Sequence, residues 1–376
     1  MIEQIAATYQ IQLRLNGQPI GDVRELAENL RWTRNRTNYG IDAIEFSLND
    51  QLFAKWCESY GTTIKAMLKP IALEARVIRN GEEIAGGFLA SLPAYQPNQA
   101  SATLQMRFDG YMNLLAGIIL PPTALATKRA NKFITDWINI ANARSAAAGK
   151  PYGFVAQSIQ NLATVQRTYD NYKSVKEAIL EMTDNVDGAG QFDVIFNPDK
   201  SYYITNNLGR TITDWQLYYP PRDGGQSIAT ISAPEVQGFA SHVLTLGAGE
   251  TSSNPDQSTV ITASSTDSNA VAEFGYFETM TQYSSVSRQA TLNGHNATDL
   301  YNATNLQWNP QITLFGRQTP PSPTADFGLW IGDQIYLENT ADPTGMTTGW
   351  FEIEAIEVSV SATGAETVKP RLERVA

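Results

Sequence analysis

The chain has 376 residues, more than one compact core usually holds, so we expect two to four domains. Charged residues make up only 17% and hydrophobic residues 42%, and Thr, Ser, Asn, Gln and Gly are abundant, a composition that favours β-structure with polar turns and large interfaces. The net charge of −11 argues against contact with phosphate backbones, and therefore against a DNA- or RNA-binding module.

The cysteine content and the N-terminus indicate where the protein folds. Cys57 is the single cysteine, which excludes an intrachain disulfide and a cysteine-based zinc site; we expect a buried, inert thiol. Residues 1–4 lack the basic and apolar segments of a signal peptide, and the longest apolar run, residues 114–120, is too short to cross a bilayer. The sequence therefore predicts folding in a reducing cytoplasm with no membrane-spanning segment.

The first 112 residues are typical of β-structure. Alternating polar and apolar residues predict strands at 11–15, 30–34, 41–48 and 103–108, with a turn at Asn16-Gly17. The clearest hairpin joins residues 73–78 to 84–89 through Asn80-Gly81, a pair that adopts positive φ at little cost. Asn49-Asp50 can cap a short helix that carries Cys57 and ends at Gly61.

From about residue 111 to residue 190 the pattern becomes helical. Phe133, Ile134, Trp137, Ile138 and Ala141 fall on one helical face, and Gly149 ends that pattern. The spacing of Ser174 and Glu177 is that of a capping box, and it predicts a second helix. A hairpin at 192–196 and 202–205 is expected to follow.

Short strands are expected again in the second half. We predict them at 242–246, 260–263 and 274–280, with a polar loop at 247–257, a turn at Asn293-Gly294 and a helix at 297–306. The last strands are predicted at 311–315, 333–337, 351–360 and 367–374.

A weak internal repeat links the two ends of the chain. The matching segments are Gly86-Gly87-Phe88 with Ala102-Thr103-Leu104 and Arg107, and Gly349-Trp350-Phe351 with Glu366-Thr367-Val368 and Arg371. Chance similarity between β-hairpins is one interpretation. The other interpretation is that the chain contains two related small β-barrels, one at each end.

No catalytic constellation is recognisable. His242 and His295 lack a Gly-x-Ser-x-Gly nucleophile elbow, and Gly247-Ala248-Gly249-Glu250 lacks the Lys-Ser/Thr pair of a phosphate loop. We therefore predict no enzyme and no catalytic, cofactor-binding or metal site, although paired carboxylates for glycoside hydrolysis stay open. The aromatic residues that could stack on sugars, or instead pack in cores and interfaces, are Trp308, Trp330, Trp350 and Tyr218-Tyr219.

Several segments, taken in order, resemble the tail hub proteins of long-tailed bacteriophages, particularly those of Gram-positive and actinobacterial hosts, and the hub region of tail-associated proteins. They are Leu30-Arg31-Trp32-Thr33-Arg34, Ile44-Glu45-Phe46-Ser47-Leu48, Gly86-Gly87-Phe88, residues 107–115, residues 243–250 and Trp330-Ile331-Gly332-Asp333-Gln334-Ile335. The longer relatives often continue into a peptidoglycan-cleaving or receptor-binding region. Since this sequence stops at Ala376, we expect no lytic activity in it.

The resemblance implies a mainly β fold with α+β insertions, in which two tail-tube-like β-barrels flank mixed α/β middle domains. The implied domains are an N-terminal barrel (1–112), a helix-containing middle domain (113–210), a β-rich middle domain (211–310) and C-terminal strands that complete the second barrel (311–376). Such hubs are trimers, and three double barrels make a pseudo-sixfold ring around the DNA exit channel.

The resemblance also implies a place in the virion. The ring would sit at the tail tip, assembled in the host cytoplasm, and would contact the distal tail protein ring, the tail tube, the tape measure protein and the fibre or spike proteins. DNA would pass without specific binding, because acidic groups repel it. The alternatives are a distal tail ring protein, with one tube-like barrel, and a glycan-binding or glycan-cleaving surface protein.

Overall fold

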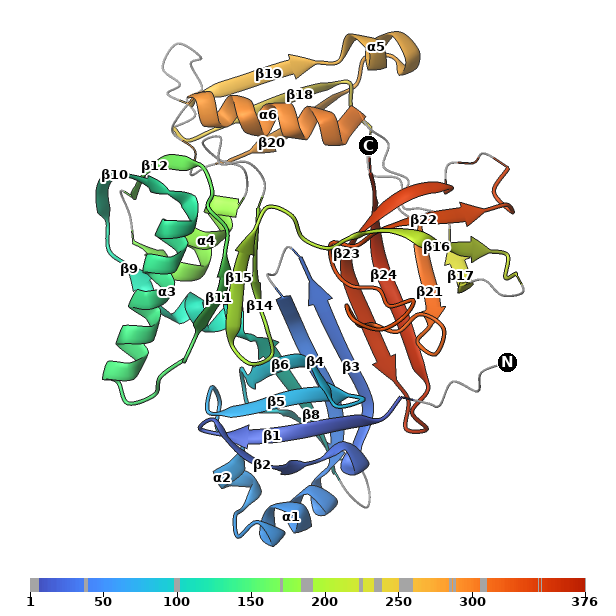
Figure 1. Ribbon diagram of the computed structural model, residues 1–376. Coiled ribbons are helices and arrows are strands. Elements are labelled where there is room, and N and C mark those ends of the chain that lie inside the picture. Colours follow the sequence, from blue (N-terminus) through green and yellow to red (C-terminus); the bar gives the residue numbers. More distant parts are fainter. Residues whose placement is uncertain are drawn as a thin grey trace.

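The computed structural model describes residues 7–36, 40–97, 102–169, 172–183, 192–222, 226–232, 239–249, 260–283, 286, 289–304, 310–343, 345 and 347–375. The molecule is mainly β, as predicted, with two strand-rich bodies side by side and two mixed α/β bodies beside and above them (Figure 1). In these ranges, no helix combines the length and the apolar character that a membrane crossing requires.

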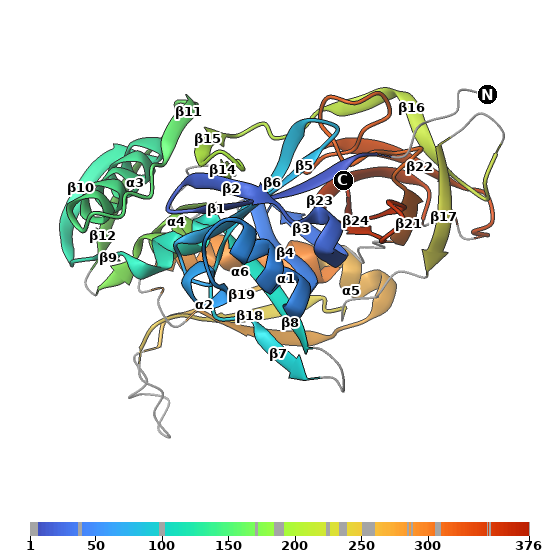
Figure 2. The same ribbon diagram turned by 90° about the horizontal axis from the view of Figure 1, so that it is seen from below.

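The N-terminal barrel is a strongly curved sheet whose strands pair in the order β2–β1–β5–β6–β8–β4–β3. Apolar residues on the inward side of these strands fill the core, while α1 and α2 cover one end (Figure 2). Asn80 and Gly81 have φ values of 50° and 86°, as the predicted tight hairpin requires. Its elements are β1 (Tyr9–Leu15), β2 (Gln18–Asp22), η1 (Arg24–Leu26), β3 (Ala27–Asn35), β4 (Gly40–Asn49), α1 (Asp50–Ser59), α2 (Ile64–Met67), β5 (Leu73–Arg79), β6 (Glu82–Leu89), β7 (Ala94–Pro97) and β8 (Ala102–Gly110).

The first middle domain packs helices against strands over its own apolar core. The predicted capping box is present: the Ser174 amide donates to Glu177 Oε2 (2.8 Å), and the Glu177 amide donates to Ser174 Oγ (3.1 Å). A Cβ on Gly86 of the barrel would lie 2.7 Å from the Pro198 carbonyl oxygen, so the β14–β15 turn sits directly on β6. The elements are η2 (Tyr111–Gly117), β9 (Ile119–Leu120), β10 (Thr123–Arg129), α3 (Ala130–Ala147), β11 (Val155–Ile159), β12 (Thr164–Tyr169), β13 (Lys173–Ser174), α4 (Val175–Thr183), β14 (Asp193–Phe196) and β15 (Ser201–Thr205).

The C-terminal barrel is closed. Its six strands pair in the cycle β16–β22–β23–β24–β21–β17–β16. They are β16 (Thr211–Tyr219), β17 (Gln226–Ser232), β21 (Gln311–Phe315), β22 (Gln334–Asn339), β23 (Gly349–Val360) and β24 (Glu366–Arg374). The predicted domain bounds remain a proposal, but this cycle assigns residues 211–232 to the barrel instead of the second middle domain.

The second middle domain is an insertion into the C-terminal barrel. It leaves after β17 and returns at β21, where Ser232 and Gln311 lie opposite each other. A three-stranded sheet, β19–β18–β20, carries α6 on one face (Figure 1). The elements are β18 (His242–Leu246), β19 (Thr262–Thr266), α5 (Ser268–Phe274), β20 (Glu278–Gln282) and α6 (Gln289–Thr304).

Two local predictions in this domain were wrong. Residue 274 ends α5 and does not start a strand, because the Asp267 carboxylate caps the amides of Asn269 (2.9 Å) and Ala270 (3.1 Å). The predicted turn at Asn293-Gly294 lies inside α6. Buried Asn296 fixes that helix to the sheet, since its amide donates to the Val243 carbonyl (2.9 Å).

The two barrels are joined into one sheet by β23. Its first residues pair with β22, and its later residues pair with β3, from Ala355–Asn35 to Val360–Leu30. One apolar core extends through both barrels. A buried ion pair crosses the same junction: Glu366 of β24 accepts from Arg79 Nε (2.7 Å) and Nη2 (2.9 Å), and also from the Tyr9 hydroxyl.

Glu366→Ala should lower the free energy of unfolding by about 3–5 kcal/mol, because Arg79 and Tyr9 would stay buried without their acceptor. Glu357→Ala, which breaks a pair whose side chains are 49% and 27% exposed, should cost less than about 1 kcal/mol. Urea unfolding of both variants checks this. Equal losses would contradict the central role of Glu366.

Candidate functional site

The joined barrels present one continuous polar face. It covers the outer side of β8, β4, β3, β23 and β24, where side chains alternate with those that fill the core. Its carboxylates outnumber its cations: Glu45, Asp109, Glu352, Glu354, Glu357 and Glu373 against Arg31, Arg107, Lys369 and Arg371. We call this surface the shared face.

A row of charges of alternating sign crosses the shared face. Arg107 Nη1 on β8 lies 2.6 Å from Glu45 Oε1 on β4, and Glu45 is paired in register with Arg31 on β3. Arg31 Nη2 lies 2.6 Å from Glu357 Oε2 on β23, which in turn faces Lys369 on β24 at 3.9 Å. The row spans both barrels, so its geometry depends on the β3–β23 pairing.

Arg36 fixes the edge of the shared face to the first middle domain. Its Nε lies 2.8 Å from Asp193 Oδ1 on β14, and its Nη1 contacts Glu352 and lies 3.2 Å from Glu354 Oε1 on β23. Burial raises the pKa of Glu354, Arg36 opposes this rise and Glu373 adds to it. Three bodies are therefore held by one guanidinium.

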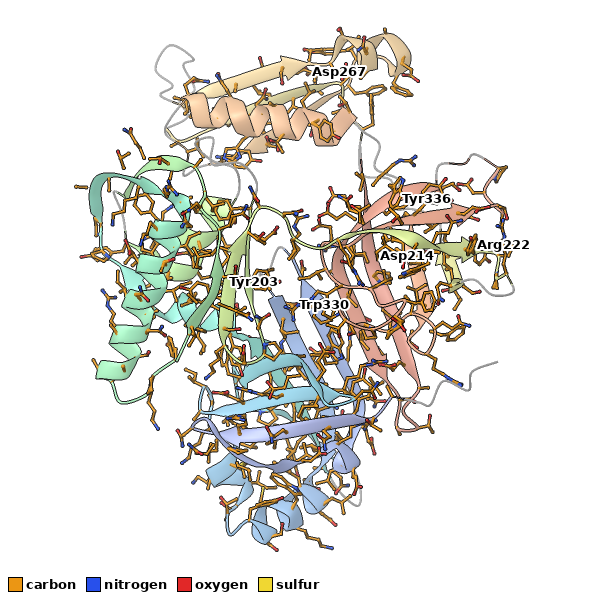
Figure 3. The ribbon with its side chains drawn as sticks, viewed as in Figure 1. Tyr203, Asp214, Arg222, Asp267, Trp330 and Tyr336 are labelled. Carbon is orange, nitrogen blue, oxygen red and sulfur yellow. The ribbon has the colours of Figure 1, made fainter. Side chains whose placement is uncertain are left out.

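A cavity of about 520 Å³ lies where the two barrels meet the first middle domain. Arg34 of β3 forms part of its wall with only 2% of its surface exposed, and its guanidinium carbon lies 4.6 Å from the centre of the Trp330 ring. Arg34 Nη2 donates to Asn197 Oδ1 at 3.4 Å. Tyr203 and Trp330 face the space between the bodies from opposite sides (Figure 3). We call this space the junction pocket.

Burial lowers the pKa of Arg34, because the charged form loses hydration, and the Tyr203 hydroxyl opposes this only in part. Burial also raises the pKa of Asp333, while Arg210 and the backbone amides that Asp333 accepts from oppose it. Among the residues that the structure describes, no group of three or more His, Cys, Asp or Glu side chains could hold a metal ion. The charged and polar groups of the pocket can recognise polar ligands, and no nucleophile paired with a base occurs among its described lining residues.

The cysteine and the two histidines that the sequence offered as candidates for chemistry lie in different parts of the structure from the junction pocket. Cys57 is buried in α1. His242 lies on β18 with Nδ1 2.7 Å from Thr266 Oγ1, and His295 stacks on Tyr283 in the same domain with ring centres 4.1 Å apart. The segment 247–249 forms a bend after β18, and Glu250 lies outside the described residues.

The aromatic candidates are also dispersed. Trp350 packs edge-on against Tyr336, and Tyr218 lies under the guanidinium of Arg222 at 4.9 Å. Trp330 is the one that the structure brings to the junction pocket, whereas Trp308 lies outside the described residues. The described members of this set therefore form no common sugar-stacking platform.

Sequence reasoning missed both the charge row and the role of Arg34. The signal for the charge row was weak. Polar residues at every second position of strands such as 30–34 indicate that a strand has an outer face, but they do not indicate which strands are its neighbours. Arg34 gave no signal, since an arginine in an exposed strand position and a buried one look alike.

Solved structures share this fold over nearly the whole chain. A tail protein from Neisseria meningitidis MC58 gives a TM-score of 0.62 at 11% identity, covering 97% of this chain and 96% of its own. A 43 kDa tail protein of prophage MuSo2 from Shewanella oneidensis gives 0.62 at 12% identity, with 98% of each chain covered. A prophage tail protein from Listeria monocytogenes EGD-e gives 0.53 at 10% identity, covering 97% and 94%.

The sequence matches no protein-family model and no curated protein. At these identities the likeness concerns the fold, so the chain has the fold of phage tail proteins. The predicted resemblance to that class is confirmed at this level, and the particular hub type stays a prediction.

Cys57 should react very slowly with iodoacetamide in the native protein at pH 8. Its thiol is buried, and burial, with Glu58 nearby, raises its pKa to about 11, so little thiolate is present. Mass spectrometry of the alkylated protein with and without denaturant measures this. Equal rates in the two conditions would mean that α1 does not protect the thiol.

Proposed function

We propose that the chain is a structural, non-enzymatic subunit of a phage tail tip, a hub that assembles as a trimer. The observation that carries this proposal is the double barrel joined through β3 and β23. Because adjacent barrels within one chain already share a sheet, three chains could close a ring of six barrels by repeating a similar side-by-side contact between subunits.

In this proposal the ring seats on the tail tube, contacts the distal tail ring and the tape measure protein, and carries the fibre or spike proteins at the tip. The shared face lines the DNA exit channel. Its excess of carboxylates would repel phosphates, while the paired cations keep the strands in register, so DNA would slide without binding.

Two alternatives are less well supported. A distal tail ring protein was expected to have one tube-like barrel, and the closed cycle of C-terminal strands gives this chain a second. A glycan-binding role would favour several aromatic rings in one groove, and the described candidates lie apart: the Trp330 ring is contacted by Arg34 in the junction pocket, whereas Trp350 packs against Tyr336.

The subunit number tests the proposal first. Light scattering of the purified full chain should give three times the chain mass of 41.3 kDa, and averaged electron images should show a ring with a central hole. If the chain alone is monomeric, mixing it with the tube and distal tail proteins of the same phage should produce the ring. A monomer that forms no ring under either condition contradicts the hub proposal.

Charge reversal tests the proposed channel lining. Wild-type protein should show no measurable affinity for duplex DNA at moderate salt, and a Glu45→Lys, Glu357→Lys double variant should gain salt-dependent binding, because both positions lie on the shared face. The matched control, Glu58→Lys with Glu273→Lys, has the same net charge away from this face. Equal DNA binding by the two double variants would contradict the assignment.

A further inference from the structure

The junction pocket has a charge distribution that the tail role does not require. Arg34 lies fully buried in its wall, yet none of the ion pairs between described residues includes its guanidinium group. Its contacts are all neutral: the Asn197 amide, the Tyr203 hydroxyl and the Trp330 ring. Arg34 Nε has no hydrogen-bond partner among the residues that the structure describes. A buried cation with only neutral partners leaves positive potential at the pocket wall.

In contrast to the buried Arg34, two carboxylates of the pocket are exposed to solvent. Glu82, at the start of β6, and Asp199, in the β14–β15 turn, both line the pocket and are solvent-exposed. Among the described residues, Glu82 Oε2 accepts only from the hydroxyls of Ser322 (3.2 Å) and Thr324 (3.3 Å). Asp199 Oδ1 accepts from the backbone amide of Ser201 (2.9 Å). Neither of these carboxylates is neutralised by a described cation within 4 Å.

The other two carboxylates in the wall are neutralised. Glu83 receives two hydrogen bonds from Arg76 Nη1, at 2.9 and 2.7 Å. Asp333 is paired with Arg210 and accepts from the amide of Trp330. The unbalanced charges of the pocket are therefore one positive group in the buried wall and two negative groups at the exposed rim.

We infer that the junction pocket binds a zwitterion, with the carboxylate of the ligand directed to Arg34 and its ammonium group directed to Glu82 and Asp199. The volume of about 520 Å³ lies in the range of small-ligand sites and accommodates an amino acid or a short peptide segment. Because the wall is contributed by both barrels and by the first middle domain, a bound zwitterion would hold the three bodies together.

The probe is 6-aminohexanoate, titrated into the full chain by calorimetry, with intrinsic tryptophan fluorescence as a second signal because Trp330 lines the pocket. Hexanoate lacks the ammonium group and hexylamine lacks the carboxylate, so both should bind at least about tenfold more weakly. Glycine and 4-aminobutanoate measure how the two charges must be spaced. Failure of every ω-amino acid to bind in the tens of millimolar would overturn the inference.

Two kinds of variant locate the binding. Arg34→Gln should abolish binding of 6-aminohexanoate. Arg222→Gln is the matched control, because Arg222 also lies over an aromatic ring, at 4.9 Å. It should leave binding unchanged, because Arg222 lies on the exposed surface away from the pocket (Figure 3). Glu82→Gln and Asp199→Asn change exposed residues and keep their hydrogen-bond acceptors, so they remain informative if Arg34→Gln does not fold. Each should weaken 6-aminohexanoate about threefold or more and leave hexanoate no weaker. Binding that none of these changes alters would place the probe elsewhere and reject the site.

The zwitterion could be a free small molecule or the side chains of a protein segment. A blocked peptide that contains one Glu and one Lys but no free ends distinguishes the two sources. Tighter binding of this peptide than of 6-aminohexanoate, lost in Arg34→Gln, indicates a segment of a partner protein. Weaker binding of the peptide indicates a free amino-acid-like ligand.

Discussion

The arrangement of the whole molecule depends on one strand that belongs to two sheets. β23 is 12 residues long, and this length lets its first residues close the C-terminal barrel against β22 while its later residues pair with β3. Backbone hydrogen bonds of a ladder fix both distance and register, so the barrels cannot slide past each other without breaking the ladder. The Arg79–Glu366 pair is buried at the same junction, and separating the barrels would break it at a cost in free energy.

The same pairing decides what the surfaces of β3 can do. Arg31 and Arg34 are three residues apart on one strand, and alternation directs them to opposite sides. Arg31 enters the charge row of the shared face, where water screens it and its pairing with Glu357 contributes little energy. Arg34 enters the wall of the junction pocket, where burial makes its charge costly unless a partner supplies the balancing one.

The middle domains are attached in different ways, and this difference decides which of them can vary without disturbing the barrels. The first is held by Arg36 and by the β14–β15 turn on β6, so it is integrated with the junction. The second leaves and re-enters the C-terminal barrel at neighbouring positions, which lets it vary with little effect on the barrel. It also carries both histidines, neither of which adjoins the junction pocket.

The sequence by itself determined the local elements. Alternation, the Asn80-Gly81 turn and the capping box at Ser174 and Glu177 predicted strands, a hairpin and a helix correctly, because each depends on the conformational preferences of adjacent residues. It also predicted the mainly β class and the likeness to phage tail proteins. Asn293-Gly294 was predicted as a turn from these two residues alone. In the structure the pair lies inside α6, because Asn296 of the same helix is fixed to the sheet through the Val243 carbonyl.

Only the tertiary structure decided which strands are neighbours. β17 pairs with β21 across an insertion of more than 70 residues, and β3 pairs with β23 across more than 300 residues of sequence. Pairings between such distant segments leave no periodic pattern in the sequence. The candidate sites follow from those pairings: the shared face needs β3 beside β23, and the junction pocket needs Arg34, Asn197 and Trp330 in one place. Alternation could say that a strand has an inner and an outer side, but the partner on each side is set by long-range packing.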